Sequence, residues 1–135
     1  MRMVRQLGRE DWILAGLLTV ARAGDKALRV EAVARELGVT KGSFYWHFRD
    51  RDAWRDALLQ FWEHRAFAAL VGMRGACRLS FGSGSAGRNA PGDVAWAALE
   101  RALRDWARRE AAVAHSWSRV QQERVRAEAA ACRAA

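Results

Sequence analysis

A single proline, Pro91, two cysteines and no long apolar run limit what this sequence can encode. A membrane-spanning helix needs roughly 18 or more consecutive apolar residues, and no stretch approaches that length. Cys77 and Cys132 have no CxxC spacing and no histidine near either, which argues against a zinc site or a disulfide framework. A glycine-rich phosphate loop and a serine–histidine–aspartate arrangement are also lacking. We therefore expect no enzyme activity, no cofactor and no metal.

An N-terminal signal peptide is the first alternative to weigh. Residues 13–21, ILAGLLTVA, follow three arginines and superficially resemble such a segment. However, Glu10 and Asp11 stand where the positive region should continue. The same residues suit an amphipathic helix over about 9–23, with the two acids in its first turn, where they complement the helix dipole. We expect a cytoplasmic protein that begins with this helix.

Charge is abundant and predominantly positive. Lys and Arg number 23 against 15 Asp and Glu, giving a formal net charge of +8. The excess is spread along the chain, at +3 for residues 1–60 (11 minus 8) and +5 for residues 61–135 (12 minus 7). A positive balance favours nucleic acid or anionic membranes as partners, but it carries no sequence specificity.

Residues 30–48, VEAVARELGVTKGSFYWHF, carry the most informative pattern. They predict two short helices, about 30–37 and 41–47, joined by a tight turn. Gly38 suits a turn position with positive φ, and the apolar Val39 can fill the space between the helices. The hydroxyl of Thr40 is expected to cap the second helix. This layout is typical of a helix-turn-helix, whose second helix enters the DNA major groove.

The second helix has two different faces. Phe44 and Phe48 are four positions apart, so they share the face that should be buried. The opposite face groups side chains that suggest a binding surface, because exposed aromatic clusters usually mark one: Ser43, Tyr45, Trp46 and His47. Lys41 places a cation in the first turn, at a cost of about 0.3–1 kcal/mol that a bound phosphate would reverse. The alternative is a helical hairpin with a large aromatic core.

The segment GVTKGSFYWHFRDRDAW resembles the signature of the tetracycline-repressor (TetR) family of bacterial transcriptional regulators. Residues 9–62 resemble that family's whole DNA-binding domain. The resemblance implies contacts to base edges or sugars by Gly42, Ser43 and Trp46. It implies contacts to phosphates by Thr40, Lys41, Tyr45, His47 and Arg51. Arg29, near the start of the helix over 30–37, is a further phosphate candidate.

The remainder of the chain departs from that family. Asp50 can cap a fourth helix, but residues 80–92, SFGSGSAGRNAPG, have the composition of a flexible linker. TetR-type regulators continue instead into a larger helical domain that encloses a small-molecule pocket and pairs with a second subunit. The resemblance therefore implies a truncated C-terminal domain without the dimer-forming helices, as a frameshift or a functional short form would produce.

The last third of the chain still has a regular apolar seam. Its members recur with spacings of three and four, interrupted at Glu110, where the helix is expected to break: Trp96, Leu99, Leu103, Trp106, Glu110, Val113, Trp117 and Val120. The seam either packs on the first and fourth helices of the same chain or pairs with another subunit, a partner or a membrane surface. We favour packing within the chain, because three exposed tryptophans would be costly in water.

These observations predict an all-α protein in two parts. Residues 1–55 form a three-helix helix-turn-helix domain continued by a fourth helix, and residues 56–135 form an incomplete ligand-binding and dimerisation region with a flexible break at about 80–92. The predicted function is sequence-specific binding of double-stranded DNA at a palindromic operator, with repression of transcription. Response to a small-molecule inducer is lost or impaired, and any homodimer is weakened. The alternative is a non-regulatory fragment that interacts with a full-length relative or is inert.

Overall fold

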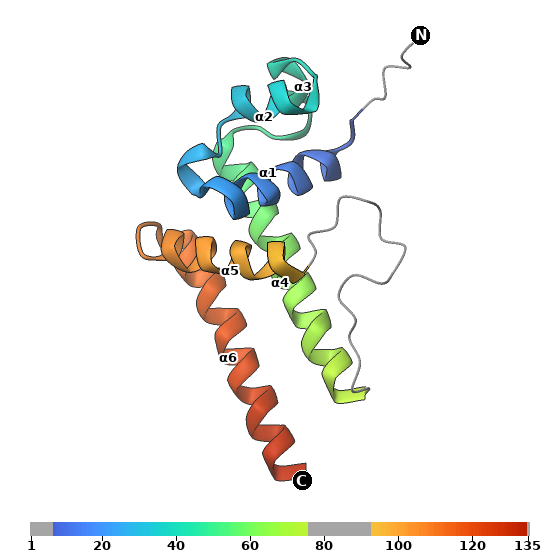
Figure 1. Cartoon of the computed structure of the whole chain (residues 1–135), viewed down its shortest axis with the longest axis vertical. Helices are drawn as coiled ribbons and strands as arrows, with labels where there is room; N and C mark the ends of the chain where they lie inside the picture. Colours follow the sequence, from blue (N-terminus) through green and yellow to red (C-terminus); the bar gives the residue numbers. More distant parts are fainter. Residues whose placement is uncertain (1–6, 76–92, 135) are drawn as a thin grey trace.

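The computed structural model describes residues 7–75 and 93–134, and all regular structure in these ranges is helical (Figure 1). The elements in chain order are α1 (Arg9–Ala23), a 3-10 helix η1 (Asp25–Ala27), α2 (Val30–Leu37), α3 (Lys41–His47), α4 (Arg51–Gly75), α5 (Asp93–Ala107) and α6 (Ala111–Ala134). The all-α prediction is confirmed, and so are the three helices expected over 9–23, 30–37 and 41–47.

Local signals account for where the first and fourth helices begin. Asp11, in the first turn of α1, accepts a hydrogen bond from the backbone N–H of Gly8 at 2.8 Å. Asp50 accepts one from the N–H of Ala53 at 2.8 Å and caps α4, as the sequence predicts. The 25-residue α4 is continuous across residue 55, the boundary expected between the two parts.

Three fully buried aromatic rings hold α1, α3 and α4 together. Trp12 meets Phe44 edge-to-face at a centroid distance of 5.3 Å and Trp54 at 6.0 Å, and Phe44 lies 5.1 Å from Trp54. The indole Nε1 of Trp54 donates a 3.0 Å hydrogen bond to the carbonyl of Trp12. Edge-to-face pairs of this kind add about 0.5–1.5 kcal/mol beyond the area they bury. The helix-turn-helix is therefore built around aromatic rings contributed by three different helices.

The seam of the last third is buried inside the chain. Leu99, Leu103, Trp106, Val113 and Val120 are almost inaccessible to solvent. Helix α5 packs on α1, α6 packs on α4, and α5 and α6 pack on each other. Packing within the chain, the first of the two alternatives for this seam, is thus confirmed. The expected break near Glu110 is also observed, because α5 ends at Ala107 and α6 starts at Ala111.

The arrangement separates two ends of the molecule (Figure 1). Helices α1, α2 and α3 gather at one end, while the long α4 and α6 extend toward the other, where α6 ends. The Gly- and Ser-rich stretch over 80–92 lies outside the described residues, and so does Cys77. Among the helices that are described, none combines the length and apolarity required to cross a bilayer.

Candidate nucleic-acid interface

The turn between α2 and α3 has the predicted geometry. Gly38 lies in the left-handed region at φ +71° and ψ +31°. Its N–H donates to the carbonyl of Arg35 at 3.2 Å, and the N–H of Val39 donates to the carbonyl of Ala34 at 3.0 Å. These two bonds form a Schellman motif, which satisfies the last carbonyls of α2 and favours glycine at this position. Val39 is half-buried against the core, as expected, and Ala34 is buried.

The prediction that the hydroxyl of Thr40 caps α3 is wrong. Thr40 occupies the N-cap position with extended backbone, but its hydroxyl makes no capping hydrogen bond. Instead, its backbone carbonyl accepts from the N–H of Ser43 at 3.1 Å, so the first turn closes without the side chain. The exposed hydroxyl of Thr40 is consequently not used to hold the helix end.

Helix α3 divides its aromatic side chains as the sequence predicts. Phe44 and Phe48 are buried and stack on each other at a centroid distance of 5.3 Å. Trp46 is 86% exposed and Tyr45 is 52% exposed. The ring of Tyr45 rests edge-on against Phe44 at 5.1 Å, which holds the phenol in place at the surface. Because an unpartnered indole in water gains nothing for stability, this face of α3 has the character of a binding surface.

Lys41 has a protein partner. Its Nζ lies 3.1 Å from Oε1 of Glu31 on α2, and both side chains are largely exposed. The hydrogen bond and the charge of Glu31 raise the pKa of Lys41 above its ordinary value. This ion pair offsets the cost of a cation in the first turn of α3, so that cost alone does not call for a phosphate. Exposed pairs of this kind are weak and exchange readily with other anions.

His47 and Arg51 both bind backbone carbonyls of their own domain. Nε2 of His47 lies 3.2 Å from the carbonyl oxygen of Leu7, which joins α3 to the segment that precedes α1. Nε of Arg51 donates to the carbonyl of Leu28 at 3.0 Å, and Nη2 donates to that of Asp25 at 3.3 Å. His47 and Arg51 thus stabilise the domain through these bonds. Any contact to phosphate would use the N–H groups of the two side chains that do not already bind these carbonyls.

The remaining candidates lie at or near the same end of the molecule. Gly42 is exposed on α3, and an added Cβ would find its nearest neighbour, Oγ1 of Thr40, at 3.8 Å. Ser43 is half-buried, and Arg29 is exposed at the N-cap position of α2. Sequence reasoning missed Arg9, whose guanidinium lies 5.1 Å from the ring centroid of Phe48 and adds a cation beside α3. The sequence offers one signal for Arg9: it lies in the first turn of α1, where a cation opposes the helix dipole and a bound anion would offset that cost.

Comparisons with known proteins agree with this geometry. Residues 16–58 match the family model for bacterial regulatory proteins of the tetR family. The structure is also similar to a crystal structure from Rhodococcus sp. that is assigned to the TetR-family transcriptional regulators, with a TM-score of 0.62 and 25% sequence identity. The match covers 88% of this chain and 66% of the Rhodococcus chain, just under two thirds of its length. In the ranges that the structure describes, no cluster of His, Cys, Asp and Glu is arranged to hold a metal ion.

Proposed function

We propose that this chain, whose residues 16–58 match the tetR family of bacterial regulatory proteins, is a regulator of that family that binds DNA sequence-specifically in the cytoplasm and represses transcription. The observation that carries the proposal is the outward face of α3, where Trp46 and Tyr45 are exposed while Phe44 and Phe48 anchor the helix from behind. A helix presented in this way fits the major groove.

Within this proposal, residues 1–55 are the DNA-binding domain. Some residues of α3 contact bases or sugars, and others contact phosphates. Gly42, Ser43 and Trp46 face base edges or sugars. Phosphates are contacted by Thr40, whose hydroxyl is free of the helix end, and by Lys41 and Tyr45, with His47, Arg51 and Arg29 adding contacts from their braced or flanking positions. Phosphate contacts set affinity and salt dependence, whereas base contacts set sequence preference.

The proposal includes a weakened response to small molecules. A ligand pocket of about 300–1,000 Å³ needs several helices whose inner faces converge on open space. In the described part of residues 56–135, α4 and α6 contact each other directly: Trp62 stacks on Trp117 at 5.6 Å with an interplanar angle of 2°, and Arg119 pairs with Glu63. These direct contacts leave no open space at that level between the two helices and support a regulator whose inducer control is lost or impaired.

Assembly is part of the same proposal. A palindromic operator is read by two half-sites, which requires two copies of the helix-turn-helix. The apolar seam of α5 and α6 is buried against α1 and α4 of the same chain, so it is not available to pair with a second copy. We therefore expect a monomer or a weak homodimer that reads each half-site separately.

Selection from random duplex DNA tests the function. The wild-type chain should enrich a common sequence, and the quadruple variant Lys41→Ala/Ser43→Ala/Tyr45→Ala/Trp46→Ala should enrich none. Arg133→Ala removes one positive charge at the far end of α6 and serves as the control; it should enrich the same sequence as wild type. If wild type binds duplex DNA no more tightly than the quadruple variant, the function is wrong, and the chain is a helical fragment without regulatory activity.

A further inference from the structure

The turn between α5 and α6 is tied to the N-terminal domain by an arginine fork. Nη1 of Arg109 donates to Oδ2 of Asp25 at 3.1 Å, and Nη2 donates to Oδ1 at 2.6 Å. Asp25 belongs to η1, and its side chain is only 13% exposed. Asp105 steadies the same guanidinium, with its Oδ2 at 2.7 Å from Nη2. Hydrogen bonding to Asp25 raises the pKa of Arg109 further above its ordinary value.

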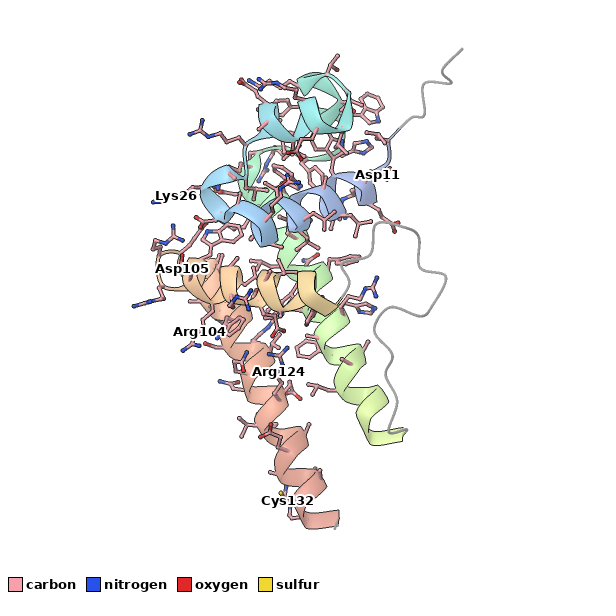
Figure 2. The ribbon with its side chains drawn as sticks, viewed as in Figure 1. Asp11, Lys26, Arg104, Asp105, Arg124 and Cys132 are labelled. Atoms are coloured by element: carbon pink, nitrogen blue, oxygen red, sulfur yellow. The ribbon has the colours of Figure 1, made fainter. Side chains whose placement is uncertain are left out.

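The next residue of the turn, Glu110, is tied to a different element. One carboxylate oxygen accepts from Arg55 of α4, and the other accepts from the indole N–H of Trp106 at 2.5 Å. Arg109 and Glu110, two consecutive residues of the turn, thus bind η1 and α4 respectively. Figure 2 shows Lys26 of η1 and Asp105 of α5 at the same edge of the molecule, where these elements are in contact.

Helix η1 depends on such polar contacts for its position. It is three residues long, and none of its residues belongs to the fully buried core. It follows Gly24, which has φ +83°, and it precedes the buried Leu28, after which α2 begins. Arg51 donates hydrogen bonds to the backbone carbonyls of Asp25 and Leu28, and Arg109 donates to the side-chain carboxylate of Asp25. Since η1 connects α1 to α2, its placement sets how α2 and α3 are presented.

We propose that Asp25 and Arg109 are positioning residues, through which the C-terminal region fixes the orientation of the helix-turn-helix for DNA. The inference rests on the proposed function, because it specifies what keeps that site in its binding geometry. A bidentate arginine–carboxylate pair fixes direction as well as distance, and its carboxylate here is largely shielded from water. Both properties distinguish the pair from ordinary exposed ion pairs.

Asp25→Asn separates positioning from simple electrostatics by the sign of its effect. The substitution removes a negative charge, so electrostatics alone predicts tighter binding to DNA. Loss of the fork predicts weaker binding, because α2 and α3 would no longer be held in one orientation. Glu36→Gln is the charge-matched control: its carboxylate pairs with Arg22 at 2.7 Å between α1 and α2, and both side chains are well exposed.

Two measurements on the full chain test the proposal, using the duplex that wild type selects. Asp25→Asn and Arg109→Gln should each weaken binding by about tenfold, and the double variant should be no weaker than the weaker single. Backbone hydrogen exchange over residues 25–37 should be faster in both variants than in Glu36→Gln. Asp25→Asn binding as tightly as Glu36→Gln, or unchanged exchange over 25–37, would overturn the proposal. If wild type selects no duplex, the proposed function fails, whereas the exchange measurement still decides whether the fork positions α2 and α3.

Discussion

At the scale of single residues, Gly38 and Gly42 stand four positions apart and have opposite requirements. Gly38 adopts φ +71°, a conformation that side-chain-bearing residues disfavour. Gly42 has ordinary helical backbone, and an added Cβ would make only an ordinary contact, 3.8 Å from Oγ1 of Thr40. Nothing in the fold therefore requires glycine at position 42, which fits the proposal that this position approaches DNA closely.

Gly42→Ala should separate stability from function. Alanine in an exposed helical position stabilises a protein by roughly 0.5–1 kcal/mol relative to glycine. We expect a higher melting temperature together with weaker binding to the selected duplex, because the added methyl group would meet the DNA. Gly38→Ala, as the contrast, should destabilise the fold by about 1–2 kcal/mol. If Gly42→Ala binds DNA as tightly as wild type, then position 42 does not approach the duplex closely.

Lys41 and Trp46 should differ in what their loss changes. Lys41→Ala should weaken binding to all sequences and lower the slope of affinity against salt by about one phosphate contact. Trp46→Ala should instead alter which base is preferred, by about 1–3 kcal/mol at the contacted position. Gel-shift titrations at several salt concentrations, on the selected duplex and its single-base variants, distinguish the two. Equal losses on every duplex for Trp46→Ala would argue against a base contact.

At the scale of helices, α1 and α4 cross at Gly16 with almost no space between them. A Cβ at this position would lie 2.9 Å from Cδ2 of Leu58 and 3.1 Å from the ring of Trp54, both fully buried. Contacts this short force neighbouring atoms to move. Glycine at position 16 is thus a packing requirement of the α1–α4 crossing.

Gly16→Ala should therefore destabilise the chain despite alanine's better helix propensity. Overpacking a close-packed core costs about 1–3 kcal/mol, which exceeds the gain of up to about 1 kcal/mol from replacing glycine. Urea unfolding followed by circular dichroism measures the difference. The double variant Gly16→Ala/Leu58→Ala should recover part of the loss, because the shorter side chain makes room for the methyl group. A neutral effect of Gly16→Ala would mean that α1 and α4 are less tightly packed than described.

The helices could be predicted from the sequence because their signals are local. The apolar period of α1, the Gly38 turn and the Asp50 cap each lie within the segment that they define. The fork between Arg109 and Asp25 could not, because it joins residues 84 positions apart and either charge alone is indistinguishable from a solvated one. In the sequence, Glu110 similarly shows only as an interruption of an apolar seam, whereas in the structure its carboxylate accepts hydrogen bonds from Arg55 and Trp106.

The candidate site was predictable in part for the same reason. Helical periodicity was enough to separate the buried Phe44 from the exposed Trp46. It could not show that Thr40 leaves its hydroxyl unused in the cap, or that Arg51 binds the carbonyls of Leu28 and Asp25. Those contacts depend on where the α1–α2 connection lies in space.

At the scale of the whole molecule, the buried seam bears on assembly. Sedimentation equilibrium at micromolar concentration should give a monomer or a weak dimer, because the seam packs within the chain. Val125, on the distal part of α6, is 64% exposed and is the described apolar side chain best placed for a weak contact there. Val125→Glu should remove any residual self-association. A tight dimer that survives this substitution would place the interface elsewhere.

The stacked Trp62–Trp117 contact between α4 and α6 bears on regulation. Small hydrophobic or cationic compounds should neither release the protein from its duplex nor raise its melting temperature. A genuine ligand at 100 times its Kd would add about 2.7 kcal/mol of stability, which a thermal shift detects easily. Trp117→Ala opens the stacked pair with Trp62 and serves as the comparison. A compound that shifts the wild-type melting temperature and also dissociates the DNA would identify a working sensor.

The distribution of tryptophan also gives the molecule an optical property. Of its seven tryptophans, Trp12, Trp54, Trp62 and Trp106 are fully buried, Trp96 and Trp117 are half-buried, and Trp46 alone lies open to solvent. Iodide, which does not penetrate protein interiors, should therefore quench the emission of Trp46 before that of the others. Occupation of the outward face of α3 would shield that indole, so the chain would report contact at α3 through its own fluorescence, without a label.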